Sequence, residues 1–241
     1  MTSIKHLTLL LFLLCLGLFT IAEGTNTPIS LRQNLKNAHP GDYLVMARNK
    51  IFSVLIIRSI DANEISIEEI TVPNSFVKEP FSWRKWVQEG ASGNTCRMIY
   101  PIQLSTGMIA SAYSINKGEW VTIPKEQNFL STLLSLQFTS IPDQERKRVG
   151  PPPVSDTPDK RPIWQPKLTI DGKTVPGVTF DAWKARWPKD GGELSGKIIE
   201  VFLPRDSDKY PAYFPYWLQV SGLVGKASLR IVDAGSGLFV Q

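Results

Sequence analysis

The sequence predicts a mainly β fold with two or three short helices, a β-rich α+β class in which antiparallel meander sheets form a sandwich or a barrel-like structure. Runs of β-branched residues of strand length recur along the 241 residues. Turn sequences such as Asp61-Ala62-Asn63 and Asp171-Gly172 separate these runs. Within residues 64–68, apolar and polar residues alternate, which is typical of a strand with one wet face.

Residues 25–141 are predicted to form a first β-rich domain. Its helices are expected near 81–89, where Trp83, Trp86 and Val87 share one face, and near 125–138, with a short helix at 29–38. The predicted strands of this domain are 43–47, 52–60, 64–72, 96–104, 108–115 and 120–123.

Residues 142–166 have a different composition, with seven prolines and nine charged residues. Proline cannot donate to a sheet ladder, so we expect an extended linker or an exposed loop here. Its basic triplet, Arg146, Lys147 and Arg148, is either a solvated part of this linker or a docking site for an acidic partner.

Residues 167–241 are predicted to form a small antiparallel β region, which could pack on the first domain. The pattern at 178–187 fits both a helix and a strand, and the alternation of Val178, Phe180 and Ala182 favours a strand. The remaining predicted strands are 167–170, 173–175, 197–203, 213–220 and 227–232.

Residues 1–24 are predicted to be a signal peptide. Lys5 precedes an apolar, uncharged run from Leu7 to Ala22, which is shorter than the ~20 residues of a membrane span. Cleavage after Ala22 and cleavage after Gly24 both fit the pattern. We therefore expect an exported protein of the periplasm, the outer surface or the medium, with no membrane span after cleavage.

Composition excludes several classes of function. Hydrophobic residues make up 42% of the chain, enough to bury a core, which excludes global disorder. The net charge of +5 is small and spread along the chain, so no nucleic-acid partner is expected. After signal cleavage the chain would keep one cysteine, Cys96, and one histidine, His39. The sequence therefore predicts no disulfide, no metal site, no cofactor and no catalytic residues.

Catalytic alternatives have little support in the sequence. A Cys96–His39 pair is formally possible, but Cys96 has none of the local signatures of cysteine enzymes. Asp190 and Glu193 near Trp187 are the candidates for a glycan-cleaving carboxylate pair.

Residues 210–217 are the strongest candidate for a binding surface, because five aromatic residues and two prolines occupy eight positions. Rings on both faces of a strand cannot all point into one core, so some are expected to be exposed to a glycan or a protein. The alternative is a proline-stiffened edge strand that caps the core. The candidate surface consists of Tyr210, Tyr213, Phe214, Tyr216 and Trp217.

Three carboxy-terminal segments resemble uncharacterised exported proteins of chlamydia-like bacteria. They are 196–201 (GKIIEV), 214–222 (FPYWLQVSG) and 229–237 (LRIVDAGSG), accompanied by Gly41-Asp42-Tyr43 and by the Trp83/Trp86 helix. The resemblance implies no activity and no functional residues. It does imply an envelope or secreted location in a Gram-negative cell.

The sequence therefore favours an exported β-rich protein that acts at the cell envelope by binding a protein or a glycan, or by a structural role, without catalysis. Two alternatives remain open. One is a glycan or peptidoglycan hydrolase that uses carboxylates, and the other is a secreted host-interaction protein.

Overall fold

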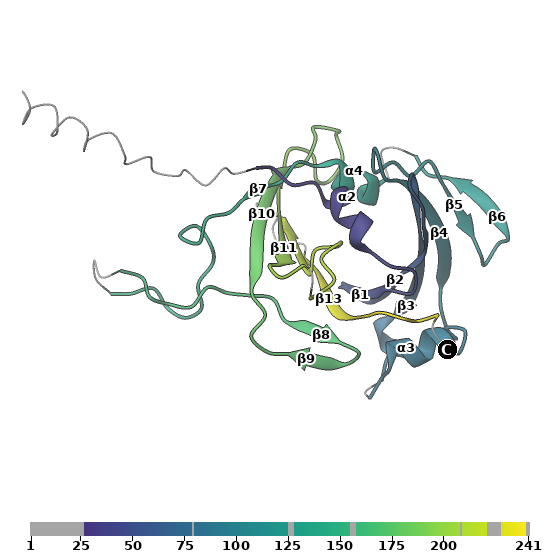
Figure 1. Cartoon of the computed structure of the whole chain (residues 1–241), viewed down its shortest axis with the longest axis horizontal. Coiled ribbons are helices and arrows are strands. Elements are labelled where there is room, and N and C mark those ends of the chain that lie inside the picture. Colours follow the sequence, from purple (N-terminus) through teal and green to yellow (C-terminus); the bar gives the residue numbers. More distant parts are fainter. Residues whose placement is uncertain are drawn as a thin grey trace, which may run out of the picture.

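The structure is a computed structural model that describes residues 27–78, 80–124, 128–154, 158–207, 209–220 and 228–239. The signal peptide predicted for residues 1–24 lies outside this range. Figure 1 shows a strongly curled sheet with short helices inside the curl and below it.

Eleven strands of the described chain form one antiparallel sheet in the order β6-β5-β4-β3-β2-β1-β13-β12-β11-β10-β7. The predicted mainly β fold class is therefore confirmed. The strands are β1 Tyr43–Arg48, β2 Ile51–Ile60, β3 Glu64–Pro73, β4 Cys96–Gln103, β5 Ser111–Ser114, β6 Glu119–Thr122, β7 Thr139–Ser140, β10 Phe180–Arg186, β11 Ile198–Pro204, β12 Trp217–Val220 and β13 Ser228–Gly235.

The sheet is open and curls around two helices. In Figure 1, β10 and β11 face β2, β3 and β4, and the helices α2 (Leu31–Asn34) and α4 (Phe129–Ser135) lie between them. A one-turn 3₁₀ helix, Leu35–Asn37, continues α2. The larger core cluster fills this concave side, where helix residues such as Leu31 and Leu134 contact apolar residues of the sheet.

Strand alternation places a second, smaller core on the opposite face. Leu55 and Ile57 of β2 point into the concave side, whereas Val54 and Ile56 belong to the outer cluster. Helix α3 (Trp83–Gln88) covers this outer cluster with the rings of Trp83 and Trp86. The amphipathic pattern at 81–89 thus produces a short helix on the outer face of the sheet.

Strand β1 joins the amino-terminal and carboxy-terminal regions of the chain. It pairs with β2 on one side and with β13 on the other, where Tyr43 lies opposite Gly235. The regions 25–141 and 167–241 therefore contribute neighbouring strands to one sheet. Because β10 also pairs with β7, the two regions meet at a second place.

The proline-rich segment 142–166 contains no strand in its described part, but it is not detached from the sheet. Arg148 and Ile163 form an isolated β-bridge that holds its two arms together. Trp164 packs edge-on against Phe202 and Trp217 on the outer face of β11 and β12. Both ends of the segment therefore contact the sheet, one through the Trp164 ring and the other through the ion pair of Glu145 with Lys184 of β10. That the segment is a linker between two domains stays a prediction.

The next element is the separate hairpin of β8 (Leu168–Ile170) and β9 (Lys173–Val175), with the predicted Asp171-Gly172 turn at its tip. This tip is fixed to β1, β13 and α3. The Tyr43 hydroxyl donates to Asp171 Oδ1 at 2.7 Å, and the amide of Gly172 donates to Asp233 Oδ1 at 3.0 Å. The Arg84 guanidinium donates to both carboxylate oxygens of Asp171.

Several element boundaries differ from those predicted. The strand predicted at 213–220 shortens to β12, because Pro215 cannot donate to a ladder. The ambiguous segment 178–187 is strand β10. The two-residue strand β7 has no clear signal in the sequence. All helices in the described part of the chain are too short or too polar to cross a bilayer.

Candidate functional site

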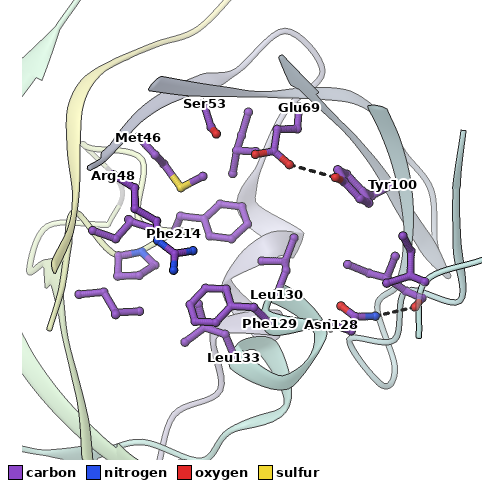
Figure 2. A pocket seen from close by; sticks show the side chains of 16 residues that line it. Met46, Arg48, Ser53, Glu69, Tyr100, Asn128, Phe129, Leu130, Leu133 and Phe214 are labelled. Atoms are coloured by element: carbon purple, nitrogen blue, oxygen red, sulfur yellow. Dashed lines mark hydrogen bonds between the residues drawn. The ribbon is translucent and has the colours of Figure 1, made fainter. Parts of the chain in front are cut away.

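A mainly apolar cavity of about 290 Å³ opens on the concave side of the sheet (Figure 2). It lies between the sheet and α4 and receives residues from β1–β4, β12, β13 and the adjoining loops. Its lining consists of Met46, Arg48, Ser53, Leu55, Glu69, Tyr100, Ile109, Ile123, Asn128, Phe129, Leu130, Leu133, Phe214, Pro215, Leu218 and Leu229.

Strand period and helix period together explain how these side chains meet. On β1, Leu44, Met46 and Arg48 alternate onto the concave face, and Met46 lies opposite Ser53 of β2. From α4, Phe129, Leu130 and Leu133 project toward the same space, because residues three and four apart share a helix face. The cavity thus depends on both elements.

Asn128 holds the amino-terminal end of α4 in place. Its Oδ1 accepts a hydrogen bond from the amide of Ser131 at 3.0 Å, as a helix N-cap does. Its Nδ2 donates to the carbonyl of Ile109 at 2.7 Å and thereby ties the helix to the loop before β5. Asn128 therefore positions the apolar wall of the cavity, and its own polar atoms are already satisfied.

Glu69 and Tyr100 form one polar group of the lining. The Tyr100 hydroxyl donates to Glu69 Oε2 at 3.0 Å across the β3–β4 pair. Burial and the neighbouring Glu69 carboxylate raise the pKa of Tyr100 well above its usual range. The hydroxyl therefore remains a proton donor at neutral pH, which fixes the carboxylate as the acceptor.

Arg48 is the second polar group, at the exposed end of β1. Figure 2 shows its guanidinium beside Phe214 and on a different side of the cavity from Glu69. The Arg48 side chain forms no hydrogen bond or ion pair with any residue that the structure describes. An unpaired guanidinium at the mouth of an apolar cavity can bind an anionic group.

The lining of the cavity contains few of the side chains that take part in acid–base or metal chemistry. Glu69 is the single carboxylate among the lining residues, and none of them is a histidine or cysteine. In the described ranges, no three Asp, Glu, His or Cys side chains are grouped so that they could hold a metal ion. Burial and Glu69 also raise the pKa of the nearby Cys96 thiol, so this thiol is not an activated nucleophile.

The aromatic segment 210–217 does not form the exposed surface that the sequence predicts. Tyr213, Phe214 and Tyr216 are 3%, 3% and 0% exposed, so this prediction is wrong for these three rings. Because Pro211 and Pro215 keep the chain out of a strand here, consecutive rings do not alternate between two faces and can all point inward. Phe214 thereby becomes part of the cavity wall.

The other two members of the predicted surface lie elsewhere. Tyr210 is half-buried and packs against the larger core, with the Lys209 ammonium over its ring. Trp217 is half-buried on the outer face of β12. The structure therefore separates Trp217 from Phe214 by the thickness of the sheet.

The basic triplet is not a free cationic patch. The Arg146 side chain is buried and donates to Asp143 and Gln165. Arg148 donates to the carbonyl of Arg161 and lies 3.6 Å from Asp159. Of the three side chains only Lys147 is exposed, so they do not form one exposed basic surface, and docking of an acidic partner stays a prediction.

The next candidates from the sequence are Asp190 and Glu193, the carboxylate pair considered for glycan cleavage. The Trp187 indole donates to Asp190 Oδ2 at 2.9 Å. Hydrogen bonds from the amide of Gly192 and from this indole hold the pKa of Asp190 below its usual range. Asp190 is therefore an ionised turn residue, and the neighbouring Glu193 is exposed.

Comparison with known proteins now gives the family. A family model described as "CT021 protein" matches residues 53–176, which is more than half of the chain. The chain belongs to the CT021 protein family. This matched stretch includes ten of the sixteen residues that line the cavity, from Ser53 to Leu133.

A solved structure supports the fold of this CT021-family protein. It is the 2.0 Å structure of the hypothetical protein CT021 from Chlamydia trachomatis, with a TM-score of 0.62 and 17% sequence identity. The match covers 87% of this chain and 93% of the other. At this identity the likeness shows a shared fold alone. No curated protein matches the chain.

The resemblance to an uncharacterised chlamydial protein is thus confirmed at the level of the family, whereas export stays a prediction. The three carboxy-terminal segments that carry the resemblance lie outside the matched residues 53–176. Of the features that carry it, only the Trp83/Trp86 helix lies within the matched range.

Proposed function

We propose that this CT021-family protein binds a small amphipathic molecule in the concave cavity, with an apolar body inside and an anionic group at Arg48. The observation that carries the proposal is the unpaired Arg48 guanidinium at the mouth of a cavity whose lining is mostly apolar. Small-molecule sites combine these two features, an apolar wall and a few polar groups that fix orientation.

The cavity wall supplies the binding energy in this proposal. Each methylene group that moves from water into such a wall contributes about 0.8 kcal/mol. Phe129, Leu130 and Leu133 contribute to this wall from α4, and Phe214 adds a further ring beside Arg48 (Figure 2). A cavity of about 290 Å³ has room for a short alkyl chain.

Charge supplies the orientation. Arg48 attracts an anionic head group, whereas the Glu69 carboxylate repels one. Because these side chains lie on different sides of the cavity in Figure 2, an anionic ligand has one favoured orientation, with its head at the open end of β1.

Paired ligands test this role of Arg48. We expect decanoate to bind the wild-type protein in calorimetric titration. Arg48→Gln should weaken decanoate binding about tenfold, the equivalent of ~1.4 kcal/mol. Decanol has the same tail without the charge, so its binding should not change in this variant.

Two further variants control this experiment. Arg230→Gln removes an exposed arginine from β13 and should bind decanoate as the wild-type protein does. Leu130→Trp fills the cavity and should weaken the binding of both decanoate and decanol. The proposal fails if decanoate does not bind, or if Arg48→Gln affects decanoate and decanol equally.

We further propose that the protein binds its ligand after export. The support is the pattern of residues 1–22, a lysine followed by an uncharged apolar run and small residues at the cleavage positions. Amino-terminal sequencing should therefore show that the mature protein begins at Glu23 or at Thr25. Recovery of the cytosolic protein with residues 1–22 still attached would contradict this proposal.

A further inference from the structure

A second cavity, of about 280 Å³, lies on the opposite face of the sheet from the first. Its floor is the outer face of β10, β11 and β12, and its wall is the start and the end of the proline-rich segment 142–166. This segment runs outside β10 in Figure 1. The structure brings together here Trp217 from the aromatic segment and Arg146 and Lys147 from the basic triplet.

Two rows of side chains form the floor. Ala182, Phe202 and Trp217 lie side by side across β10, β11 and β12, and Lys184, Glu200 and Gln219 form the next row on the same face. The first row is mainly aromatic and the second is polar. Strand register therefore places an aromatic strip directly beside a strip of hydrogen-bonding groups.

Trp164 completes the aromatic part from the wall. Its ring centroid lies 5.4 Å from that of Phe202 and 5.0 Å from that of Trp217, both in edge-on geometry. Trp164 and Trp217 are each half-buried, so parts of both indoles remain accessible. Indole rings offer flat apolar faces together with one polar N–H group.

The polar groups of this strip already form an ion pair and a hydrogen bond. Lys184 Nζ lies 2.8 Å from Glu145 Oε2, and Gln219 donates to Glu200. The site consequently presents alternating donors and acceptors with little net charge. A ligand that matches it must both donate and accept hydrogen bonds, and it gains little from a formal charge of its own.

Arg146 adds an unsatisfied donor to this cavity. Its side chain is 4% exposed and donates through Nη1 to Asp143 at 3.2 Å and through Nη2 to Gln165 at 3.3 Å. Its Nε is buried and has no hydrogen-bond partner among the described residues. Buried N–H groups are nearly always paired in proteins, so this donor points to an acceptor supplied by a ligand.

We infer that this second cavity is a carbohydrate site for a short neutral saccharide. The C–H face of a sugar ring packs on an indole, and its hydroxyl groups donate and accept in turn. The polar strip supplies the acceptors of Glu145 and Glu200 and the donors of Lys184 and Gln219. Arg146 lines the same cavity, and a small shift of its side chain would let its unpartnered Nε donate to a hydroxyl or ring oxygen of the sugar.

Calorimetric titration with four disaccharides tests this inference: cellobiose, lactose, maltose and N,N′-diacetylchitobiose. At least one of them should bind the wild-type mature protein. Trp217→Ala should weaken the binding of that disaccharide about tenfold, which corresponds to ~1.4 kcal/mol. Glu200→Gln keeps the shape of the side chain and should weaken disaccharide binding severalfold. Because this variant is expected to fold normally, the weaker binding would reflect a lost contact with the sugar.

Matched controls separate this site from the concave cavity and from general effects. Trp120→Ala removes an exposed indole from β6 and should leave disaccharide binding unchanged. Arg48→Gln should also leave it unchanged, because Arg48 lies on the other face of the sheet. The inference is overturned if none of the four disaccharides binds, if Trp217→Ala and Glu200→Gln bind as well as the wild type, or if Trp120→Ala weakens binding equally.

Discussion

At the scale of single residues, one glycine decides how closely β13 approaches β1. Gly235 lies opposite Tyr43, whose ring is 1% exposed and whose hydroxyl donates to Asp171. A Cβ atom at Gly235 would collide with Cε1 of Tyr43 and would lie 2.8 Å from Asp171 Oδ1. The absent side chain therefore makes room for the contact between the β8–β9 hairpin and β1.

Gly235→Ala tests this close approach. Because the Tyr43 ring is buried and hydrogen-bonded, it cannot move aside easily, and overpacking of this kind costs about 1–3 kcal/mol. Urea denaturation should show that loss in the free energy of unfolding. Gly192→Ala is the matched control, because its nearest neighbour is the Asp190 carboxylate of the same exposed loop. Equal stabilities of the two variants would contradict the packing described here.

At the scale of elements, local pattern was a good guide wherever one periodicity dominated. Alternation in 64–68 and the tryptophan spacing of 83–87 correspond to β3 and α3. The segment 210–217 is the counterexample. Its prolines prevent strand geometry, so rings that were predicted to be exposed on a strand are buried instead. The two-residue β7 forms through its neighbour β10 and has too few residues to show any pattern.

At the scale of the whole molecule, the chain is joined by strand pairs that are distant in sequence. The pair of β1 with β13 and the pair of β7 with β10 connect the regions on either side of segment 142–166. Apolar residues from both regions also belong to one core, for example Leu55 and Val201. The two regions thus depend on each other for burial of their apolar faces, as expected for a carboxy-terminal part this short.

Cleavage of the proline-rich segment tests this interdependence. A specific protease site inserted after Val154, which is fully exposed, should be cut without loss of the fold. We expect both fragments to elute together in size-exclusion chromatography, because the β1–β13 ladder and the shared core remain. The same cleaved protein should separate in concentrated denaturant. Fragments that elute apart under native conditions would show that the two regions are independent.

The two cavities show how little of a site a sequence reveals. Trp217, Arg146 and Lys147 were all candidates from the sequence, but for two separate surfaces, and the fold places them in one cavity. Arg48, Glu69 and Tyr100 had no signal of their own. Arginine, glutamate and tyrosine on strands are common, and only their common position on the concave face distinguishes them.

The sequence by itself determined the fold class, most strand and helix positions and the poverty of imidazole and thiol groups, because these follow from local spacing and composition. Tertiary structure alone decided which strands are neighbours, which aromatic rings are buried and where the cavities lie. These properties depend on contacts between residues far apart in the chain, such as Tyr43 with Gly235 and Trp164 with Trp217. No local periodicity encodes such contacts.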